Sequence, residues 1–70
     1  MNINEQPTLD HKDDLRLMTV VEAADYLAMS RGSVYNLMRS GAITSMHIGR
    51  ARRIPLAELH RFVRSTLSAV

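Results

Sequence analysis

Apolar side chains recur at helical spacing along the middle of this 70-residue chain. The first group follows the i, i+3, i+4, i+7 pattern of one helical face, and it consists of Val20, Ala23, Ala24 and Leu27. Thr19 and Glu22 have the spacing of a capping box, in which each side chain bonds the backbone N–H of the other residue. The pattern therefore predicts a helix that begins at Thr19 and ends near Ala28 or Met29.

A second helix is predicted almost immediately afterwards. Ser30 is a favourable N-cap, and Gly41, which follows Ser40, is a favourable C-terminal stop. The apolar stripe between them consists of Val34, Leu37 and Met38. Because so few residues separate this helix, about 31–40, from the first, the two helices must meet at a sharp angle. This arrangement is typical of a helix-turn-helix.

The pattern after the second helix changes to one that suits β-strands. β-compatible residues lie on both sides of Gly49, which predicts a hairpin with strands near 44–48 and 52–54. We expect roughly three or five residues in the hairpin tip, since only an odd loop length places Ile48 and Ile54 on the same face. Both isoleucines are then expected to anchor the hairpin to the helices.

A third helix is predicted after Pro55, whose fixed φ suits a first helical turn. Its apolar stripe consists of Leu56, Leu59, Phe62 and Val63, and the helix covers about residues 56–66. A two-stranded ribbon is not stable alone, so the hairpin must pack on the helices. The predicted fold class is mostly α with a small β-hairpin, a winged helix-turn-helix over residues 16–70. An acidic N-terminal arm, residues 1–15, precedes it and is expected to be flexible.

Charge is distributed unevenly along the chain. Residues 1–30 carry six acidic and two basic side chains, a net charge of −4, whereas residues 31–70 carry seven arginines and one acid, Glu58, a net charge of +6. This imbalance favours a polyanionic partner for the C-terminal half. The planar fork of arginine suits phosphate and guanine edges, which points to nucleic acid. The alternative is a solvated basic face without a partner.

Several classes of protein are disfavoured by what the sequence lacks. It contains no cysteine, no apolar run near the ~18 residues of a membrane helix, and no signal peptide. Its histidines, His11, His47 and His60, are too dispersed to indicate a metal site. No nucleophile–base pair, phosphate-binding loop or paired carboxylates are evident. We therefore expect a soluble, non-enzymatic protein of the bacterial cytoplasm, without catalytic residues, a metal site or a membrane partner.

The second predicted helix carries the candidate surface for base readout. When its apolar stripe faces inward, five polar side chains lie outward or at the helix start: Arg31, Ser33, Tyr35, Asn36 and Arg39. Asparagine can pair with adenine N6 and N7, arginine with guanine O6 and N7, and serine or tyrosine with phosphate. An ordinary solvated helix face is the alternative, but the position in the basic half favours contact with double-stranded DNA.

Three arginines, Arg50, Arg52 and Arg53, lie in the predicted hairpin tip. A tip projects from the domain, so charged side chains there lose little hydration in the free protein. On DNA they can enter a narrow groove or contact phosphates. The alternative is that they protect an exposed strand edge from aggregation, which explains one or two charges better than three.

Residues 18–63 resemble a known family. They read MTVVEAADYLAMSRGSVYNLMRSGAITSMHIGRARRIPLAELHRFV, and the spacing of their Glu-Ala-Ala, Ser-Arg, Arg-Ser-Gly, Ile-Gly-Arg and Arg-Ile-Pro groups is similar to that of the excisionase-type, MerR-like winged helix-turn-helix domain. The resemblance implies that Ser30–Ser40 is a recognition helix in the major groove. It implies that Gly49–Arg53 is a wing that reaches a neighbouring minor groove or phosphates. Arg52 stands at a position that is often aromatic in the family.

The resemblance also implies a function. Excisionases of this type are small phage or mobile-element proteins, or recombination directionality factors, that need no cofactor. They bind repeated sites in attachment DNA beside other copies of themselves, bend the DNA and bias an integrase toward excision. The resemblance therefore implies a protein associated with the nucleoid of a bacterial host cell. Because the chain ends soon after the third helix, without a coiled coil or effector domain, we do not expect an inducer-binding MerR activator. Two alternatives stay open: a small phage or prophage transcriptional regulator with the same fold, and a protein-interaction adaptor whose basic face meets an acidic protein.

Overall fold

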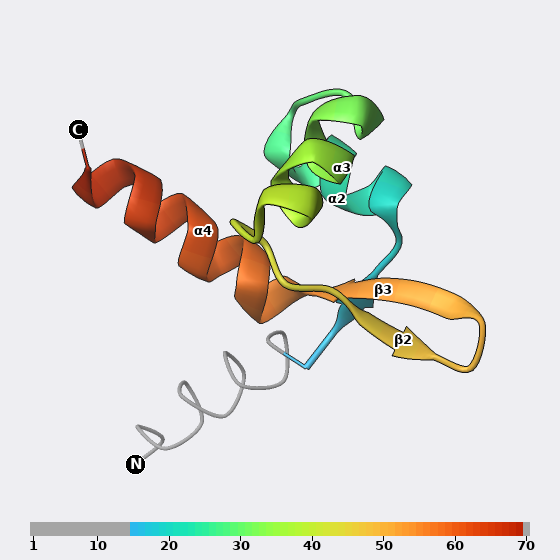
Figure 1. Ribbon diagram of the computed structural model, residues 1–70. Coiled ribbons are helices and arrows are strands. Elements are labelled where there is room, and N and C mark those ends of the chain that lie inside the picture. Colours follow the sequence, from blue (N-terminus) through green and yellow to red (C-terminus); the bar gives the residue numbers. More distant parts are fainter. Residues whose placement is uncertain (1–14, 70) are drawn as a thin grey trace, which may run out of the picture.

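Six secondary-structure elements follow one another along residues 15–69, which the computed structural model describes. They are β1 (Leu17–Met18), α2 (Val20–Leu27), α3 (Arg31–Ser40), β2 (Met46–Ile48), β3 (Ala51–Pro55) and α4 (Leu56–Ser68). Figure 1 shows α2 and α3 together on one side of the sheet, with the β2–β3 ribbon and α4 extending in opposite directions. The predicted fold class, mostly α with a small β-hairpin wing, is confirmed. Apart from Leu15, the predicted acidic arm lies outside the described residues.

Both helices of the helix-turn-helix begin with the caps that the sequence predicts. The Thr19 N–H donates to Glu22 Oε1 at 2.9 Å, and the Glu22 N–H donates to Thr19 Oγ1 at 3.1 Å, so the capping box is complete. At the start of α3, the Ser33 N–H donates to Ser30 Oγ at 3.1 Å. Three residues, 28–30, join α2 to α3.

The same two helices end on a residue with left-handed backbone conformation. Ala28 follows α2 with a φ of 57°, and Gly41 follows α3 with a φ of 84°. In each case the N–H of the next residue donates to the carbonyl five positions earlier at 2.9 Å, as in a Schellman motif. Glycine adopts this conformation without a steric penalty, whereas alanine does not.

A third strand, which we did not predict, lies beside the wing. β1 pairs antiparallel with β3, with Met18 opposite Ile54, and the sheet order is β1-β3-β2. The Leu56 N–H also donates to the carbonyl of Arg16 at 2.8 Å. A strand of two residues is too short to show a period in the sequence. β1 therefore joins the base of the wing to the start of the domain.

The hairpin tip contains two residues, Gly49 and Arg50, and not the three or five that we predicted. Ile48 pairs with Ala51, and Gly49 has a φ of 63°, which suits a two-residue turn with glycine in its first central position. The even loop length puts Ile48 and Ile54 on opposite faces of the ribbon. Ile54 is fully buried, whereas 52% of Ile48 is exposed. The predicted role of Ile48 as an anchor is therefore wrong.

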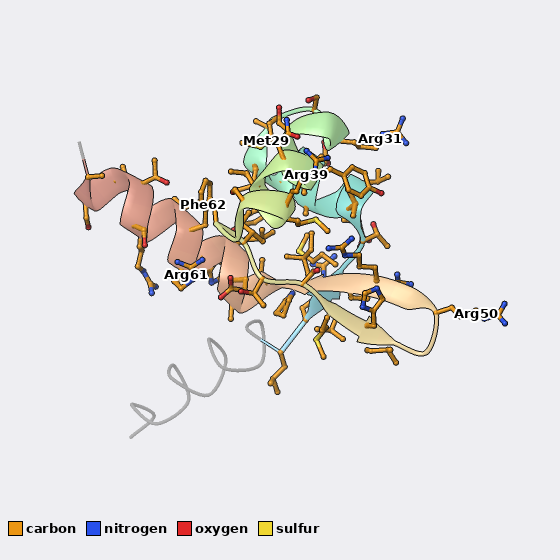
Figure 2. The ribbon with its side chains drawn as sticks, in the orientation of Figure 1. Met29, Arg31, Arg39, Arg50, Arg61 and Phe62 are labelled. Atoms are coloured by element: carbon orange, nitrogen blue, oxygen red, sulfur yellow. The ribbon has the colours of Figure 1, made fainter. Side chains whose placement is uncertain are left out.

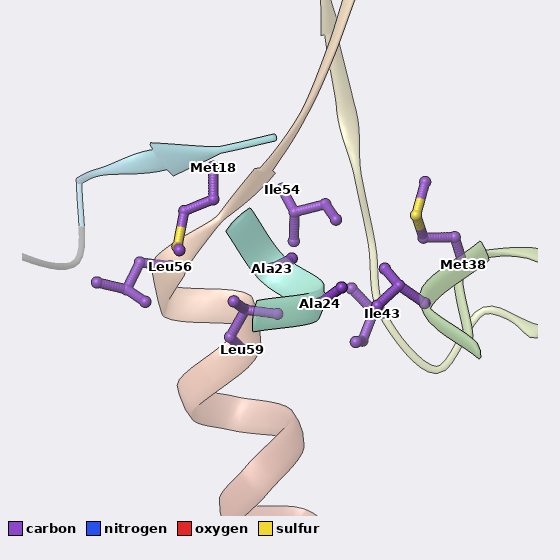
Figure 3. Packing of buried hydrophobic residues seen from close by; sticks show 9 residues of the cluster. Met18, Ala23, Ala24, Met38, Ile43, Ile54, Leu56 and Leu59 are labelled. Atoms are coloured by element: carbon purple, nitrogen blue, oxygen red, sulfur yellow. The ribbon is translucent and has the colours of Figure 1, made fainter. Parts of the chain in front are cut away.

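A hydrophobic core lies where the helices meet the sheet (Figure 3). Within the described part of the chain it consists of Met18, Ala23, Ala24, Val34, Met38, Ile43, Ile54, Leu56 and Leu59. β2 contributes no buried residue. Val63, which we placed on the apolar stripe of α4, is 38% exposed, because the C-terminal part of α4 extends beyond the body of the domain (Figure 1). The core thus positions α3 and the base of the wing.

Candidate nucleic-acid interface

All five side chains that we assigned to the recognition helix are exposed on α3. Val34 and Met38 are buried beneath the helix, so its opposite side meets solvent. Asn36 and Arg39 lie on that side, Ser33 and Tyr35 flank it, and Arg31 is exposed at the start of the helix. The orientation predicted from helical periodicity is therefore present, and the contact of these residues with DNA stays a prediction.

The N-terminal end of α3 is suited to an anion. Its first turn contains no acidic residue, and the helix dipole places partial positive charge there. The Arg31 side chain is exposed and makes no hydrogen bond or ion pair with any other residue among 15–69. The Ser30 hydroxyl donates to Ser33 Oγ at 3.0 Å, which leaves the Ser33 hydroxyl proton free to donate to a phosphate oxygen.

Asn36 and Arg39 form a pair on the outward face. Arg39 Nη1 donates to Asn36 Oδ1 at 2.6 Å, from positions three residues apart that are neighbours on a helix surface. An amide oxygen has two lone pairs, so Asn36 can accept a second hydrogen bond. The bond to Arg39 fixes which end of the Asn36 amide is the acceptor, and it couples the positions of the two side chains.

The three arginines of the wing do not lie together at its tip. Only Arg50 is in the turn, whereas Arg52 and Arg53 lie in β3, where successive side chains point to opposite faces. Arg52 Nε donates to Ser45 Oγ at 2.9 Å, and Arg53 Nη1 donates to the carbonyl of Arg52 at 2.8 Å. Our placement of all three arginines at the tip is wrong, because the turn contains only Gly49 and Arg50, and Arg52 and Arg53 belong to the strand that we predicted at 52–54.

Two arginines from different elements project toward the same side of the molecule. Figure 2 shows Arg31, at the start of α3, and Arg50, at the tip of the wing, pointing the same way, while Arg61 of α4 lies on the opposite side. Arg50 makes no hydrogen bond or ion pair with the rest of the described chain. We call the exposed polar side chains of α3 together with Arg50 the basic face. The arginines of the C-terminal half therefore do not form one continuous surface.

Glu58 and Arg61 of α4 make polar contacts that we did not predict. Glu58 Oε2 accepts from Arg61 Nε at 3.0 Å, and Glu58 Oε1 accepts from the Thr44 N–H at 2.9 Å. The hydrogen bond from Arg61, followed by that from Thr44, lowers the pKa of Glu58 below its ordinary value. One feature of the sequence could have drawn attention to Glu58, since it is the only acid among residues 31–70.

Two other kinds of site find no support in the described residues. Across residues 15–69, no three His, Asp or Glu side chains gather where they could hold a metal ion. His47 and His60 lie on different elements, β2 and α4. None of the helices in this same stretch is long and apolar enough to span a membrane.

The second helix of this helix-turn-helix turns a polar face outward, and the wing beside it carries an arginine at its tip. These two features are typical of a DNA-binding protein. Comparison with known proteins agrees, because residues 17–66 match the helix-turn-helix domain family. The match covers more than half of the chain, and the chain therefore belongs to this family.

A relative from Saccharopolyspora erythraea bears the name "Probable excisionase". It is 54% identical to this chain over 39 residues, which make up 56% of this chain and 40% of the relative. The excisionase-type resemblance is thus confirmed, and the aligned part spans less than half of the relative's length. No solved structure matches the chain significantly.

Proposed function

We propose that this protein is an excisionase, an architectural DNA-binding protein that promotes integrase-mediated excision of a prophage or mobile element and disfavours integration. The observation that carries the proposal is the basic face, in which Arg31 and Arg50 project to the same side from α3 and from the wing. The family match over residues 17–66 and the excisionase-named relative support it.

In this proposal α3 lies in a major groove. An α-helix with its side chains is about 10–12 Å across, which fits the major groove of B-DNA, about 12 Å wide. The ten residues of α3 extend about 15 Å along its axis. Asn36 and Arg39 face base edges, because they lie on the side of the helix directly opposite the buried Val34 and Met38. Arg31 and Ser33 contact phosphate at the positive end of the helix dipole, and Tyr35 contacts phosphate at the groove wall.

The wing contacts DNA beside that groove. Arg50 reaches furthest, since it lies in the turn and has no partner among the described residues, and it enters the minor groove or binds phosphate. Arg52 and Arg53 add positive charge closer to the body of the domain. Simultaneous contact by α3 and by the wing favours DNA that bends toward the protein, because the bend brings more phosphates to the arginines.

Several copies are proposed to act together. A single module of this size buries about 600–1,000 Å² of protein surface on DNA, and it therefore binds weakly alone. Copies side by side on repeated sites in attachment DNA bind more tightly and stabilise a complex with an integrase. Residues 16–70 form the DNA-binding domain in this proposal, and residues 1–15 have no assigned role.

Excision in vitro with the cognate integrase and attachment-site DNA tests the proposal. Wild-type protein should raise the yield of excision and lower that of integration. A variant with both Arg31→Ala and Arg50→Ala should lose this effect, because it removes the unpaired arginines of the basic face. Arg64→Ala, which removes one arginine from α4, serves as the matched control and should retain it.

Two results would contradict the proposal in different ways. If the protein binds attachment-site DNA but leaves excision unchanged, the transcriptional regulator becomes the better assignment. If a gel-shift assay at low salt detects no binding to attachment-site or random DNA, both DNA-binding functions are excluded and the interaction adaptor is left.

A further inference from the structure

The loop between α3 and β2 is bound to α4 by two side chains. The Ala42 carbonyl accepts from Arg61 Nη2 at 2.6 Å, and the Thr44 N–H donates to Glu58 Oε1 at 2.9 Å. Arg61 Nε and Nη2 also donate to the Glu58 carboxylate at 3.0 and 3.1 Å. Glu58 and Arg61 thus bind each other and the loop in one network, which we call the Glu58–Arg61 clamp.

The clamp holds the loop on both sides of a buried residue. Ile43, between Ala42 and Thr44, is only 1% exposed and packs in the core. Its side chain fixes the loop by apolar contact, and the clamp fixes the direction of the backbone before and after it. The loop therefore has little conformational freedom at three consecutive residues.

This loop connects the two parts of the basic face. α3 ends at Ser40 and β2 begins at Met46. Because β2 contributes no buried residue, its position depends on its pairing with β3 and on the loop. A protein that contacts two adjacent grooves must hold its two contacting elements at the spacing that the duplex sets, and such precision requires supporting contacts behind the site.

Glu58 and Arg61 are not placed to touch the same DNA themselves. Arg61 lies on the side of the molecule opposite to Arg31 and Arg50 (Figure 2). Glu58 carries a negative charge that phosphate repels, yet it is the only acid among residues 31–70. A role exerted through the loop accounts for the position of both residues.

We propose that Glu58 and Arg61 are positioning residues that set DNA specificity by holding α3 and the wing at a fixed spacing. The inference rests on the proposed function, because it requires α3 and the wing to be the elements that contact DNA. A role in stability alone would weaken binding to every DNA through the folded fraction. A positioning role lowers affinity for attachment-site DNA more than affinity for random DNA.

The affinity for attachment-site DNA divided by the affinity for random DNA, which we call the ratio, tests the proposal. It is measured by gel shift for the full chain, at a temperature where circular dichroism shows every variant folded. Arg61→Ala should lower the ratio by about tenfold, which corresponds to the loss of one good base contact. Arg64→Ala is the matched control, since the Arg64 side chain is exposed and makes no hydrogen bond or ion pair with the described residues. It should leave the ratio unchanged.

Glu58 variants sharpen the comparison. Glu58→Ala should lower affinity for attachment-site DNA and leave affinity for random DNA unchanged or higher, because it removes the only acid among residues 31–70. Glu58→Gln keeps an acceptor for the Thr44 N–H but loses the ion pair, so its ratio should lie between those of wild type and Glu58→Ala. A ratio equal to that of wild type in both Arg61→Ala and Glu58→Ala would overturn the proposal.

A second measurement tests the positioning without DNA. The chain contains no cysteine, so spin labels can be attached at Tyr35→Cys in α3 and His47→Cys in β2, both of which are exposed positions. The distance distribution between the labels should be narrow in the otherwise wild-type protein and with Arg64→Ala, and broader or shifted with Arg61→Ala. The same distribution in all three proteins would exclude the positioning role, even if the protein did not bind DNA and the proposed function failed.

Discussion

Ile48 and Ile54 lie on opposite faces of the β-ribbon, on either side of a two-residue turn. Ile54 is fully buried in the core, while 52% of Ile48 is exposed. Ile54→Ala should therefore lower the free energy of unfolding by about 2–5 kcal/mol, and Ile48→Ala by less than about 1 kcal/mol. Urea unfolding of the two variants measures both values. Equal losses would show that Ile48 also packs on the core, as an odd-length turn would require.

Ala28 and Gly41 occupy equivalent left-handed positions at the ends of α2 and α3. No atom lies within 4 Å of a Cβ placed on Gly41, so only the backbone conformation penalises a side chain there. Gly41→Ala should destabilise the protein by about 1 kcal/mol, and Ala28→Gly should stabilise it by up to about 1 kcal/mol. Thermal unfolding should show a lower Tm for Gly41→Ala and a higher Tm for Ala28→Gly. A lower Tm for Ala28→Gly would mean that Ala28 carries no strain.

Two carboxylates stabilise the folded protein in their ionised form. The backbone N–H of Thr19 lowers the pKa of Glu22, and Arg61 followed by Thr44 lowers the pKa of Glu58. Each pKa lies below its ordinary value of 4.5, which applies to the unfolded chain. Stabilisation is therefore complete above that pH and is lost as the pH falls through the folded-state pKa values.

The Tm should accordingly fall when the solution is acidified below about pH 4.5, and the fall should be smaller for Glu58→Gln. Scanning calorimetry from neutral pH to about pH 3 measures this difference. Parallel curves of Tm against pH for wild type and Glu58→Gln would show that Glu58 contributes nothing to the acid sensitivity.

The hydrogen bond between Asn36 and Arg39 predicts non-additive effects on base recognition. Asn36→Ala should weaken the binding free energy on the specific site by about 1–3 kcal/mol and change binding to random DNA little. Because Arg39 orients the Asn36 amide, Arg39→Ala should lose discrimination at two neighbouring base pairs, and the double variant should lose less than the sum of the single losses. The affinities of the single and double variants for duplexes with single base-pair changes measure both the lost discrimination and the non-additivity. Additive losses at separate base pairs would contradict the coupling.

Arg50→Ala should weaken binding to attachment-site and random DNA by the same factor. Since it removes one phosphate contact, the slope of log K against log salt should become shallower by about one. Arg52→Ala provides the comparison and should change the slope less, because Arg52 Nε already bonds Ser45 within the protein. If Arg50→Ala lowered only specific binding, the wing would recognise sequence or groove shape.

The helices and their caps follow from the sequence because the interactions that define them are local. Thr19 and Glu22 bond each other across three positions, as do Ser30 and Ser33. The periodicity that buries Val34 also turns the candidate recognition residues outward. For the same reason, the helix-turn-helix and one half of the basic face could be predicted without a structure.

The tertiary structure decided the turn of the wing and the contacts between α4 and the loop before β2. The number of residues in the turn, two instead of an odd number, determined the faces of Ile48 and Ile54 and left Arg50 as the one wing arginine in the tip. A change of one residue in a loop reverses every side chain of a strand, and sequence periodicity does not specify loop length. The bonds from α4 to the loop join residues 14 and 19 positions apart. No local pattern encodes such contacts, because they arise only when the packed core brings Glu58 and Arg61 beside the backbone of Thr44 and Ala42.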